Sequence, residues 1–489
     1  MTTYRIILFT IIMGVALLLV SCSDDGPTSP SNEAPIAILS ASPTDVEVGQ
    51  IVQLDGTDSS DPDGDDLSYS WSFTVPDGST TTLSDASVAD PVFVADMQGS
   101  FSITLTVSDG QAEDSDEIEI TASPCPTQII ESNINADRTL SKICAVPRHA
   151  DYIVSGFIDI TDAVVTIEAG VRIEFEEDAA LRVNDSAALN AQGTGADQII
   201  MVGTQEEAGF WRGILFRADD LESELNRVSI SDGGREPFGG AQVASNITVD
   251  SDARLRLTNS VSIRSGGYGL YVEPRGALPG FQNNSIDSRS DAHILIPGSL
   301  MGTIDSNTDL LTGDQEPRAV HVYEAGGINE EMTISNLVFA GYRLQGFFNI
   351  NAPVTIENGV EMEFEEDAAL RVNDGGSLIA EGTAEEPIRM IGAEQTPGFW
   401  RGILFRADNL TSELNHVEIA ESGSEAFAGV GMEPANIVVD VDASLTLSNS
   451  IIRDSNGWGV WLNSDERVEF IEEGNTYHNN ATGAVGVRD

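Results

Sequence analysis

The sequence repeats itself over a long distance. Residues 174–185 (EFEEDAALRVND) recur unchanged at 363–374, a shift in numbering of 363 − 174 = 189. Residues 209–219 (GFWRGILFRAD) recur at 398–408 with the same shift (398 − 209 = 189). Two long copies of one pattern must fold alike, so the chain from about residue 125 onward is interpreted as a duplication.

We divide this part of the chain into 123–299 (copy 1) and 300–489 (copy 2). Within each copy, short runs of strand-forming residues recur at a spacing of roughly 20 to 25 residues, separated by Gly, Asn, Asp and Ser. Examples are 165–167, 171–175 and 199–202. No amphipathic helix pattern is visible. Strand-only repeats of this length favour a parallel β-helix, a solenoid whose stacked coils bury alternate residues in one core.

Alternation along the strands predicts which side chains face the core. The expected inward set is Ile173, Phe175, Leu181 and Val183, and the expected outward set is Glu174, Glu176, Arg182 and Asn184. Arg182 could then pair with glutamates of a neighbouring coil. Exposed pairs of this kind contribute only about 0–1 kcal/mol each.

Two segments carry a family resemblance. Residues 166–171 (TIEAGV) and 376–383 (GSLIAEGT) resemble the right-handed β-helix repeats of bacterial surface proteins, a pectin-lyase-like architecture. The resemblance covers most of residues 150–489 and implies a duplicated right-handed parallel β-helix. The alternatives are a propeller, whose blade signature is absent, and a row of sandwiches.

Residues 34–122 have a different pattern, with short alternating runs broken by Gly, Pro, Asp and Ser. Such strands with frequent turns predict an immunoglobulin-like β-sandwich, so the whole chain is expected to be all-β. The motifs LDGT, DPDGD, the Tyr69 and Trp71 pair, and VSDG resemble the PKD modules of bacterial surface proteins. The resemblance implies that Trp71 is the core tryptophan under the two sheets.

A cluster of carboxylates lies in one turn of this region. The residues are Asp61, Asp63, Asp65 and Asp66. Several carboxylates around a glycine can bind Ca²⁺ through oxygen, which makes this turn a candidate calcium site. The alternative is a Pro-Asp-Gly turn whose acids are simply solvated, and the full EF-hand pattern is absent.

The first residues indicate where the chain is sent. Residues 1–21 have one cationic residue, Arg5, followed by an apolar run of about 15 residues, as in a signal peptide. The sequence Leu-Val-Ser-Cys that ends at Cys22 resembles the bacterial lipobox, which implies that Cys22 is acylated. Ser23 after the cysteine implies sorting to the outer membrane, and the acids that follow resemble a signal for surface exposure. Residues 22–33 read as a tether.

The charge excludes some partners. The 489 residues include 24 Lys+Arg and 79 Asp+Glu, a net charge of −55. Phosphate binding needs clustered cations, so nucleic acid and a basic membrane-docking face are excluded. Lys142 is the sole lysine, and this acidic, lysine-poor composition resembles that of proteins from salt-loving bacteria. High net charge also favours a soluble monomer.

The chain has three cysteines. With Cys22 used for lipid, Cys125 and Cys144 form an even pair in an oxidising compartment, which predicts a disulfide. Two free thiols are the alternative. A zinc site is not indicated, because His149 is the only histidine near the pair.

Catalytic patterns are scarce. A polysaccharide lyase or glycoside hydrolase of the pectin-lyase-like type is the alternative function, with Arg212 and Arg401 as possible bases. Each, however, sits beside a tryptophan in a duplicated segment. The five histidines are scattered, and no phosphate loop is present.

The aromatic residues offer a binding hypothesis. Residues 266–272 (GGYGLYV) match 456–462 (NGWGVWL), so Tyr271 corresponds to Trp461. Both are expected to point outward and, with the neighbouring Tyr268 and Trp458, could stack on sugar rings. Local packing under a loop is the alternative, as it is for Trp211 and Trp400.

The sequence therefore predicts a non-catalytic, lipid-anchored surface protein that displays a β-helix for adhesion or polysaccharide binding. The ligand could be a polysaccharide or a surface protein. A structural envelope protein without a soluble ligand is a further alternative.

Overall fold

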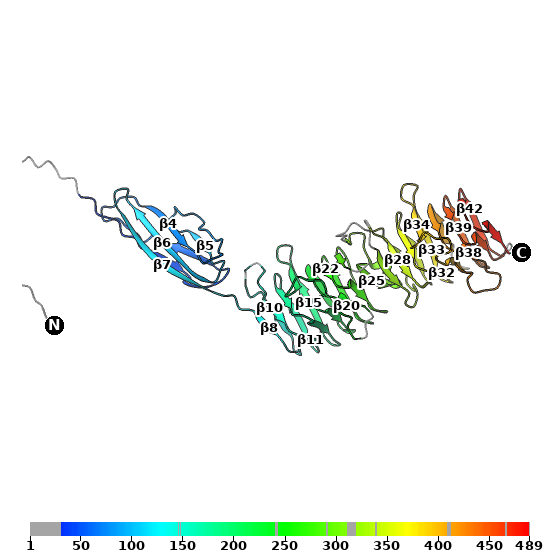
Figure 1. The fold of residues 1–489 in the computed structure, drawn as a ribbon, viewed down its shortest axis with the longest axis horizontal. Coiled ribbons are helices and arrows are strands. Elements are labelled where there is room, and N and C mark those ends of the chain that lie inside the picture. Colours follow the sequence, from blue (N-terminus) through cyan, green and yellow to red (C-terminus); the bar gives the residue numbers. More distant parts are fainter. Residues whose placement is uncertain are drawn as a thin grey trace, which may run out of the picture. The chain divides into compact units, whose positions relative to one another are not determined.

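The computed structural model describes residues 31–144, 146, 148–239, 243–289, 292–310, 319–337, 340–407, 412–464 and 467–488. The chain divides into two compact units, Met1–Pro124 and Cys125–Asp489 (Figure 1). Both are built from strands, and the one helical segment among the described residues is the short 3₁₀ helix η1 (Gly298–Thr303). No helix in the described part of the chain is both long and apolar enough to cross a membrane.

The first unit is a sandwich of two sheets, with strand orders β1-β3-β5 and β2-β7-β6-β4. Its strands are β1 (Ser40–Ser42), β2 (Asp45–Glu47), β3 (Ile51–Asp55), β4 (Ser68–Thr74), β5 (Val92–Val94), β6 (Gly99–Ser108) and β7 (Glu113–Ser123). Alternate residues of β6 are fully buried, as period-two patterning requires. Trp71 is buried in this core, as expected, and its indole N–H donates to the carbonyl of Val88 at 2.7 Å.

In the second unit, successive strands belong to different parallel sheets, and the chain returns to each sheet in a fixed order. We call the stretch from one strand of a sheet to the next strand of the same sheet a coil. The strands of copy 1 belong to three sheets. The first holds β8 (Gln128–Ile130), β10 (Tyr152–Val154), β13 (Arg172–Phe175), β16 (Ile199–Gly203), β19 (Val228–Ser231), β22 (Val261–Ser265) and β24 (Ser285–Ser288). The second holds β9 (Arg138–Leu140), β12 (Val164–Ile167), β15 (Ala188–Gln192), β18 (Ser223–Asn226) and β21 (Leu255–Thr258).

The third sheet runs on into copy 2, and we call it the long sheet. Its strands are β11 (Phe157–Ile160), β14 (Ala180–Val183), β17 (Gly213–Phe216), β20 (Ser245–Val249), β23 (Tyr268–Val272), β25 (Ile294–Pro297), β26 (Val320–Tyr323), β28 (Tyr342–Gln345), β31 (Glu361–Phe364), β34 (Ile388–Gly392), β37 (Val417–Ala420), β40 (Ile451–Arg453) and β43 (Thr476–His478).

Two more sheets belong to copy 2 alone. One holds β27 (Met332–Ile334), β30 (Pro353–Ile356), β33 (Ser377–Glu381), β36 (Ser412–Asn415), β39 (Ser444–Ser448) and β42 (Glu469–Glu473). The other, which we call the β29 sheet, holds β29 (Phe347–Ile350), β32 (Ala369–Val372), β35 (Gly402–Phe405), β38 (Ala435–Val439), β41 (Trp458–Leu462) and β44 (Gly483–Val487).

The inward residues form one continuous core through both copies. Ile173, Phe175, Leu181 and Val183 are all buried, as the alternation predicts. Asp178 and its copy 2 counterpart Asp367 turn the chain between strands with positive φ angles of 61° and 58°, a conformation that Asp tolerates better than most residues.

Coil length departs from the expected spacing. Tyr152 pairs with Ile173, a step of 173 − 152 = 21 along the chain, but Leu181 pairs with Ile214, a step of 214 − 181 = 33. The spacing expected from the sequence is therefore wrong for the longer coils. The extra residues form loops outside the strands, which stacked coils accept because their core depends only on the strands.

Corresponding strands of the two copies do not join the same sheets. Tyr342 in β28 corresponds in sequence to Tyr152 in β10, and Phe347 in β29 corresponds to Phe157 in β11. Yet β28 continues the sheet of β11, whereas β29 belongs to a new sheet. Copy 2 is therefore offset from copy 1 by one sheet position, and the segment from β25 to β26 joins the two patterns.

Candidate functional site

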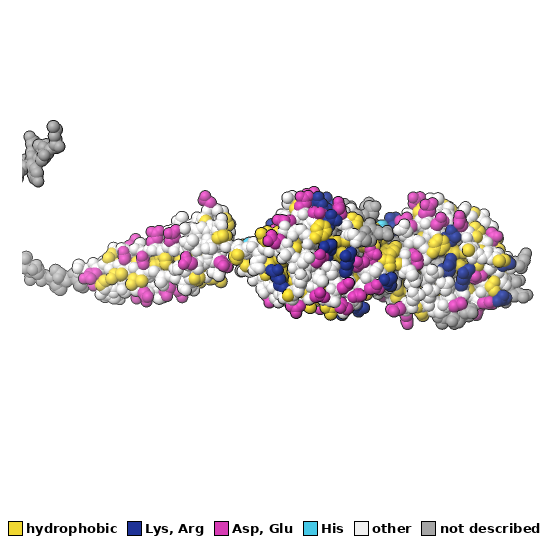
Figure 2. Space-filling model, turned by 90° about the horizontal axis from the view of Figure 1, so that it is seen from below, with side chains coloured by type: hydrophobic (Ala, Val, Ile, Leu, Met, Phe, Trp, Pro, Cys, Tyr) yellow, Lys and Arg dark blue, Asp and Glu magenta, His cyan; other side chains and the backbone are white. Residues whose placement is uncertain are grey.

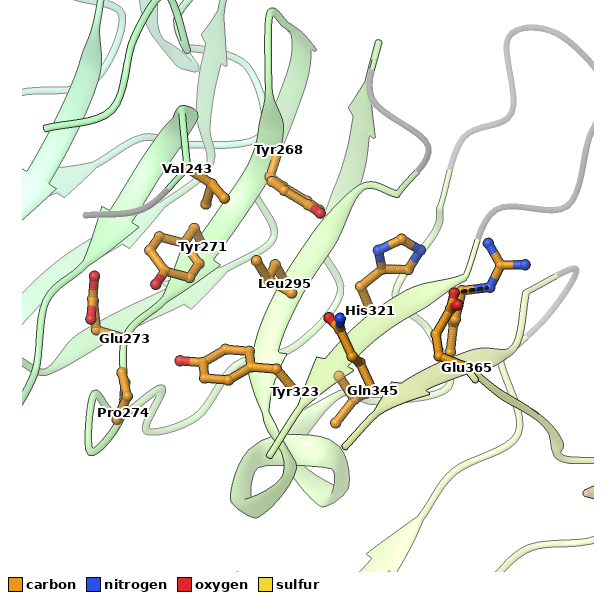
Figure 3. A pocket seen from close by; sticks show the side chains of 12 residues that line it. Val243, Tyr268, Tyr271, Glu273, Pro274, Leu295, His321, Tyr323, Gln345 and Glu365 are labelled. Atoms are coloured by element: carbon orange, nitrogen blue, oxygen red, sulfur yellow. Dashed lines mark ion pairs between the residues drawn. The ribbon is translucent and has the colours of Figure 1, made fainter. Parts of the chain in front are cut away.

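An open depression lies on the outer face of the long sheet, where copy 1 meets copy 2 (Figure 3). We call it the junction groove and define it by Tyr268, Tyr271, Glu273, His321, Tyr323, Arg343, Gln345 and Glu365. Its volume is about 540 Å³. Strands β23, β25, β26 and β28 form its floor, so residues from both copies contribute.

Strand register places the groove's side chains in a row. Tyr271 pairs with Leu295, Leu295 with His321, and His321 with Arg343. The row faces outward because Leu270 and Val272, the neighbours of Tyr271, are fully buried in the core. Neighbouring strands lie about 4.8 Å apart, so the row extends over roughly 14 Å.

Aromatic rings line the groove from both copies. The rings of Tyr268 and His321 are 6.2 Å apart in an edge-on arrangement, and those of Tyr271 and Tyr323 are 6.5 Å apart. The hydroxyl of Tyr323 donates to the carbonyl of Val272 at 2.8 Å, which fixes that ring. Such an arrangement leaves aromatic faces and edges around an open space.

Charged groups flank these rings. Nε of Arg343 lies 3.2 Å from a carboxylate oxygen of Glu363. It also lies 3.3 Å from a carboxylate oxygen of Glu365, the ion pair that is dashed in Figure 3. At the other end, Oε1 of Glu273 is buried and has no hydrogen-bond partner among the described residues. Burial raises the pKa of the Glu273 carboxyl. Burial and the nearby Glu273 carboxylate also raise the pKa of Tyr271 above its usual range.

The structure separates the four aromatic residues singled out from the sequence. Tyr268 and Tyr271 lie in the junction groove, whereas Trp458 and Trp461 lie together on the β29 sheet with ring centres 5.8 Å apart. Tyr271 and Trp461 occupy the outer face as expected, but neither is exposed, at 4% and 8%. Both residues therefore point outward as predicted, and neighbouring side chains cover them.

Loop packing explains the burial of Trp461. Trp461 belongs to one buried apolar cluster with Phe427 and Met432, and its indole N–H donates to the carbonyl of Gly431 at 2.9 Å. Local packing under a loop, the alternative considered for this residue, thus describes Trp461. Tyr271 is instead surrounded by other groove residues.

The duplicated tryptophans are packed in the core, and Arg212, next to Trp211, is ion-paired. Trp211 stacks on Phe175 at 3.8 Å and Trp400 on Phe364 at 4.0 Å, and both tryptophans are fully buried. Arg212 is paired with Asp178 at 2.7 Å.

Arg182 pairs at 2.7 Å with Asp159 of the preceding coil, so the prediction of a glutamate partner is wrong. An aspartate reaches because it lies directly opposite Arg182 in the strand register.

The other predicted site residues lie away from the groove. Cys125 and Cys144 form a disulfide with Cα atoms 6.1 Å apart at the start of the second unit.

In the aspartate turn of the first unit, Oδ1 of Asp61 accepts a hydrogen bond from the backbone N–H of Asp63 at 2.8 Å. No three His, Cys, Asp or Glu residues of the described chain are placed to hold a metal ion, so calcium at this turn stays a prediction. Cys22 lies outside the described residues.

Sequence reasoning missed the other six groove residues, which are Glu273, His321, Tyr323, Arg343, Gln345 and Glu365. His321 and Tyr323 lie at the end of the joining segment, which has no clear copy in the other half of the duplication. Alternation in residues 320–323 (VHVY) signals a strand with His321 and Tyr323 on one face, but nothing in the sequence places that strand next to β25 and β28.

Comparisons with known proteins identify one part of the chain. Residues 32–122 match the PKD domain family. No curated protein matches the chain. A solved nucleoside hydrolase-related hypothetical protein from Saccharophagus degradans, associated with carbohydrate metabolism, is 24% identical with a TM-score of 0.18, covering 19% of this chain and 26% of that one. A carbohydrate-binding module of the β-sandwich superfamily is 26% identical with a TM-score of 0.17, covering 20% of this chain and 38% of that one.

Proposed function

We propose that the junction groove binds a polysaccharide. The observation that carries this proposal is the gathering of three tyrosines and a histidine with Arg343, Gln345 and two carboxylates in one open depression. Aromatic rings can pack on the apolar faces of sugars, while the polar side chains can bond sugar hydroxyls and fix orientation. The row from Tyr271 to Arg343 is long enough for more than one sugar ring.

We further propose that the second unit is a right-handed parallel β-helix and that the chain is a lipoprotein of the bacterial outer membrane. The parallel pairing of successive coils and the repeat segments support the first point. The lipobox-like sequence ending at Cys22 supports the second. In this arrangement the PKD-like sandwich acts as a spacer between the lipid and the β-helix.

Affinity electrophoresis tests the binding proposal. The chain from Ser23 onward would be run through native gels that contain neutral or acidic polysaccharides, with a gel lacking polysaccharide as reference. We expect retardation by at least one polysaccharide, and about ten-fold weaker binding for Tyr268→Ala and for Arg343→Ala. Phe157→Ala is the matched control, because Phe157 is a 41% exposed aromatic residue of the same long sheet but lies outside the groove.

The outcomes separate clearly. Retardation that both groove variants lose and the Phe157 variant keeps supports the proposal. Unchanged mobility of the wild-type chain in every gel, or equal retardation of all variants, contradicts it.

Cleavage of the bound polysaccharide is the second candidate function. It is favoured by Glu273, a carboxyl with a raised pKa that lies in the groove, since such groups serve as general acids. A cleared zone around the protein in the same gels, lost in Glu273→Gln, would establish it. Retardation without a cleared zone would support binding without cleavage.

A further inference from the structure

An arginine on the β29 sheet lacks the carboxylate that its counterpart has. In copy 1, Arg182 lies opposite Asp159 and pairs with it at 2.7 Å. In copy 2, Arg371 occupies the same register position, but the residue opposite is Asn349. No described carboxylate lies within salt-bridge distance of Arg371. Its Nε is buried without a hydrogen-bond partner, as is Nε of Arg182, so the two copies differ in the missing carboxylate rather than in Nε.

A second arginine beside it has also lost a partner. In copy 1, Arg212 pairs with Asp178 through Nε at 2.7 Å. Its counterpart Arg401 has a buried Nε without a partner and, among the described residues, meets a single carboxylate, that of Glu425, at 2.9 Å. Asp367, which corresponds to Asp178, instead accepts a hydrogen bond from Ser424 at 2.6 Å.

One aromatic ring holds the two arginines together. The guanidinium carbon of Arg401 lies 4.9 Å from the ring centre of Phe347, and that of Arg371 lies 6.0 Å from it. Cation–π contact can hold a guanidinium in place without neutralising its charge. Burial together with the positive charges of Arg406 and Arg401 lowers the pKa of Arg371, which is the shift expected where cations outnumber nearby anions.

This excess of positive charge stands out in its setting. The chain carries a net charge of −55, and acidic side chains are spread over the surface seen in Figure 2. Buried N–H groups without acceptors are unfavourable, because they have lost their bonds to water. An oxyanion bound beside these guanidinium groups would supply an acceptor and neutralise part of the charge. Guanidinium groups are well suited to bind carboxylate, sulfate and similar oxyanions.

We propose that Arg371 and Arg401 form a binding site for one oxyanion, a carboxylate or a sulfate, carried by a sugar or free in solution. The site lies on the β29 sheet and uses none of the residues that define the junction groove. It therefore stands even if the groove binds no polysaccharide. Copy 1 lacks this site because Asp159 and Asp178 already occupy its arginines.

Isothermal titration calorimetry of the chain from Ser23 onward tests this proposal. The probes are sodium sulfate, sodium glucuronate, hyaluronan as a carboxylate-bearing polysaccharide, and neutral dextran. Ionic strength is kept constant with sodium chloride, because screening would otherwise change with each addition. The key variant is Asn349→Asp, which gives copy 2 the carboxylate of copy 1. The matched control is Asp159→Asn, the reverse exchange in copy 1.

Each variant places a side chain that the other copy already accommodates at the same register position, so both are expected to fold. We expect saturable binding of sulfate or glucuronate by the wild-type chain. Asn349→Asp should weaken it by about ten-fold or more, and Asp159→Asn should not weaken it. Arg371→Gln should give the same loss as Asn349→Asp.

Tighter binding of hyaluronan than of glucuronate would assign the oxyanion to a sugar chain, and equal or weaker binding would assign it to a free ion; either result supports the site. The proposal is overturned if the wild-type chain shows no saturable binding of sulfate or glucuronate. Equal binding by the wild type and by Asn349→Asp would overturn it as well.

Discussion

At one register position on the outer face, copy 1 carries Tyr271 and copy 2 carries Trp461. Tyr271 lies beside Tyr323 and Glu273 at the rim of an open groove. Trp461 lies under a loop that includes Phe427 and Met432. The inner faces of the two copies, in contrast, repeat each other down to the Trp211 and Trp400 stacks.

The difference shows how a duplication can diverge without harm to its fold. Inner residues face one shared core, where a change in volume is costly. Outer residues meet loops and neighbouring coils that differ between the copies. We therefore expect matched substitutions to agree on the inner face and to disagree on the outer face.

The largest expected effect concerns the inner face. Trp211→Ala and Trp400→Ala should each lower the free energy of unfolding by about 3–5 kcal/mol, because each removes a fully buried indole and its hydrogen bond. Urea unfolding followed by circular dichroism measures this. Losses that differ by more than about 2 kcal/mol between the two variants would break the equivalence of the inner faces.

The next effect concerns the start of copy 1, which has the Cys125–Cys144 disulfide, whereas copy 2 has no cysteine. Replacing both cysteines by serine should cost about 3 kcal/mol, since the bond closes a loop with a sequence separation of 19. Hydrogen exchange should show faster exchange in β8 to β10. Uniform exchange in all coils would mean that the disulfide stabilises the whole second unit.

An effect of similar size, confined to copy 2, should separate the outer faces. Trp461→Ala should destabilise copy 2 by about 3 kcal/mol, because Phe427 and Met432 lose their packing partner, and should leave polysaccharide binding unchanged. Tyr271→Ala should weaken polysaccharide binding with a smaller loss of stability. Thermal melts and affinity gels measure the two properties. Weakened binding in Trp461→Ala would show that the outer faces act alike.

The smallest effect depends on pH. Glu273 in copy 1 corresponds to Asn463 in copy 2. Because burial raises the pKa of Glu273, folding disfavours its ionised form. The resulting penalty is absent below the pKa of the unfolded chain and grows as pH rises through the folded pKa.

Glu273→Gln should therefore stabilise the protein near neutral pH, by less than about 1 kcal/mol because the carboxyl is partly screened by solvent. It should have no effect near about pH 3.5, where the carboxyl is protonated in both states. Asn463→Glu is the reverse exchange and should destabilise copy 2 near neutral pH, since the new carboxylate would lie beside Asp440. Thermal melts of the wild type and both variants at the two pH values measure these changes in stability. Stabilisation by Glu273→Gln at low pH only would contradict the assignment.

The sequence by itself determined the repeat and the inner faces. The identical segments 174–185 and 363–374 must form the same strands, and period-two alternation places Phe175 and Phe364 in the core. The same reasoning predicted the sandwich, and the resemblance to PKD modules implied the burial of Trp71. These features follow from local patterns, because strand geometry alone fixes which side chains share a face.

Only the tertiary structure decided what the outer faces do. The junction groove depends on the offset of copy 2 by one sheet position, which brings His321 and Arg343 into one row with Tyr271. The loop over Trp461 and the missing partner of Arg371 likewise depend on which coils lie next to each other. Strand pairing between distant segments sets these contacts, and no local pattern records it.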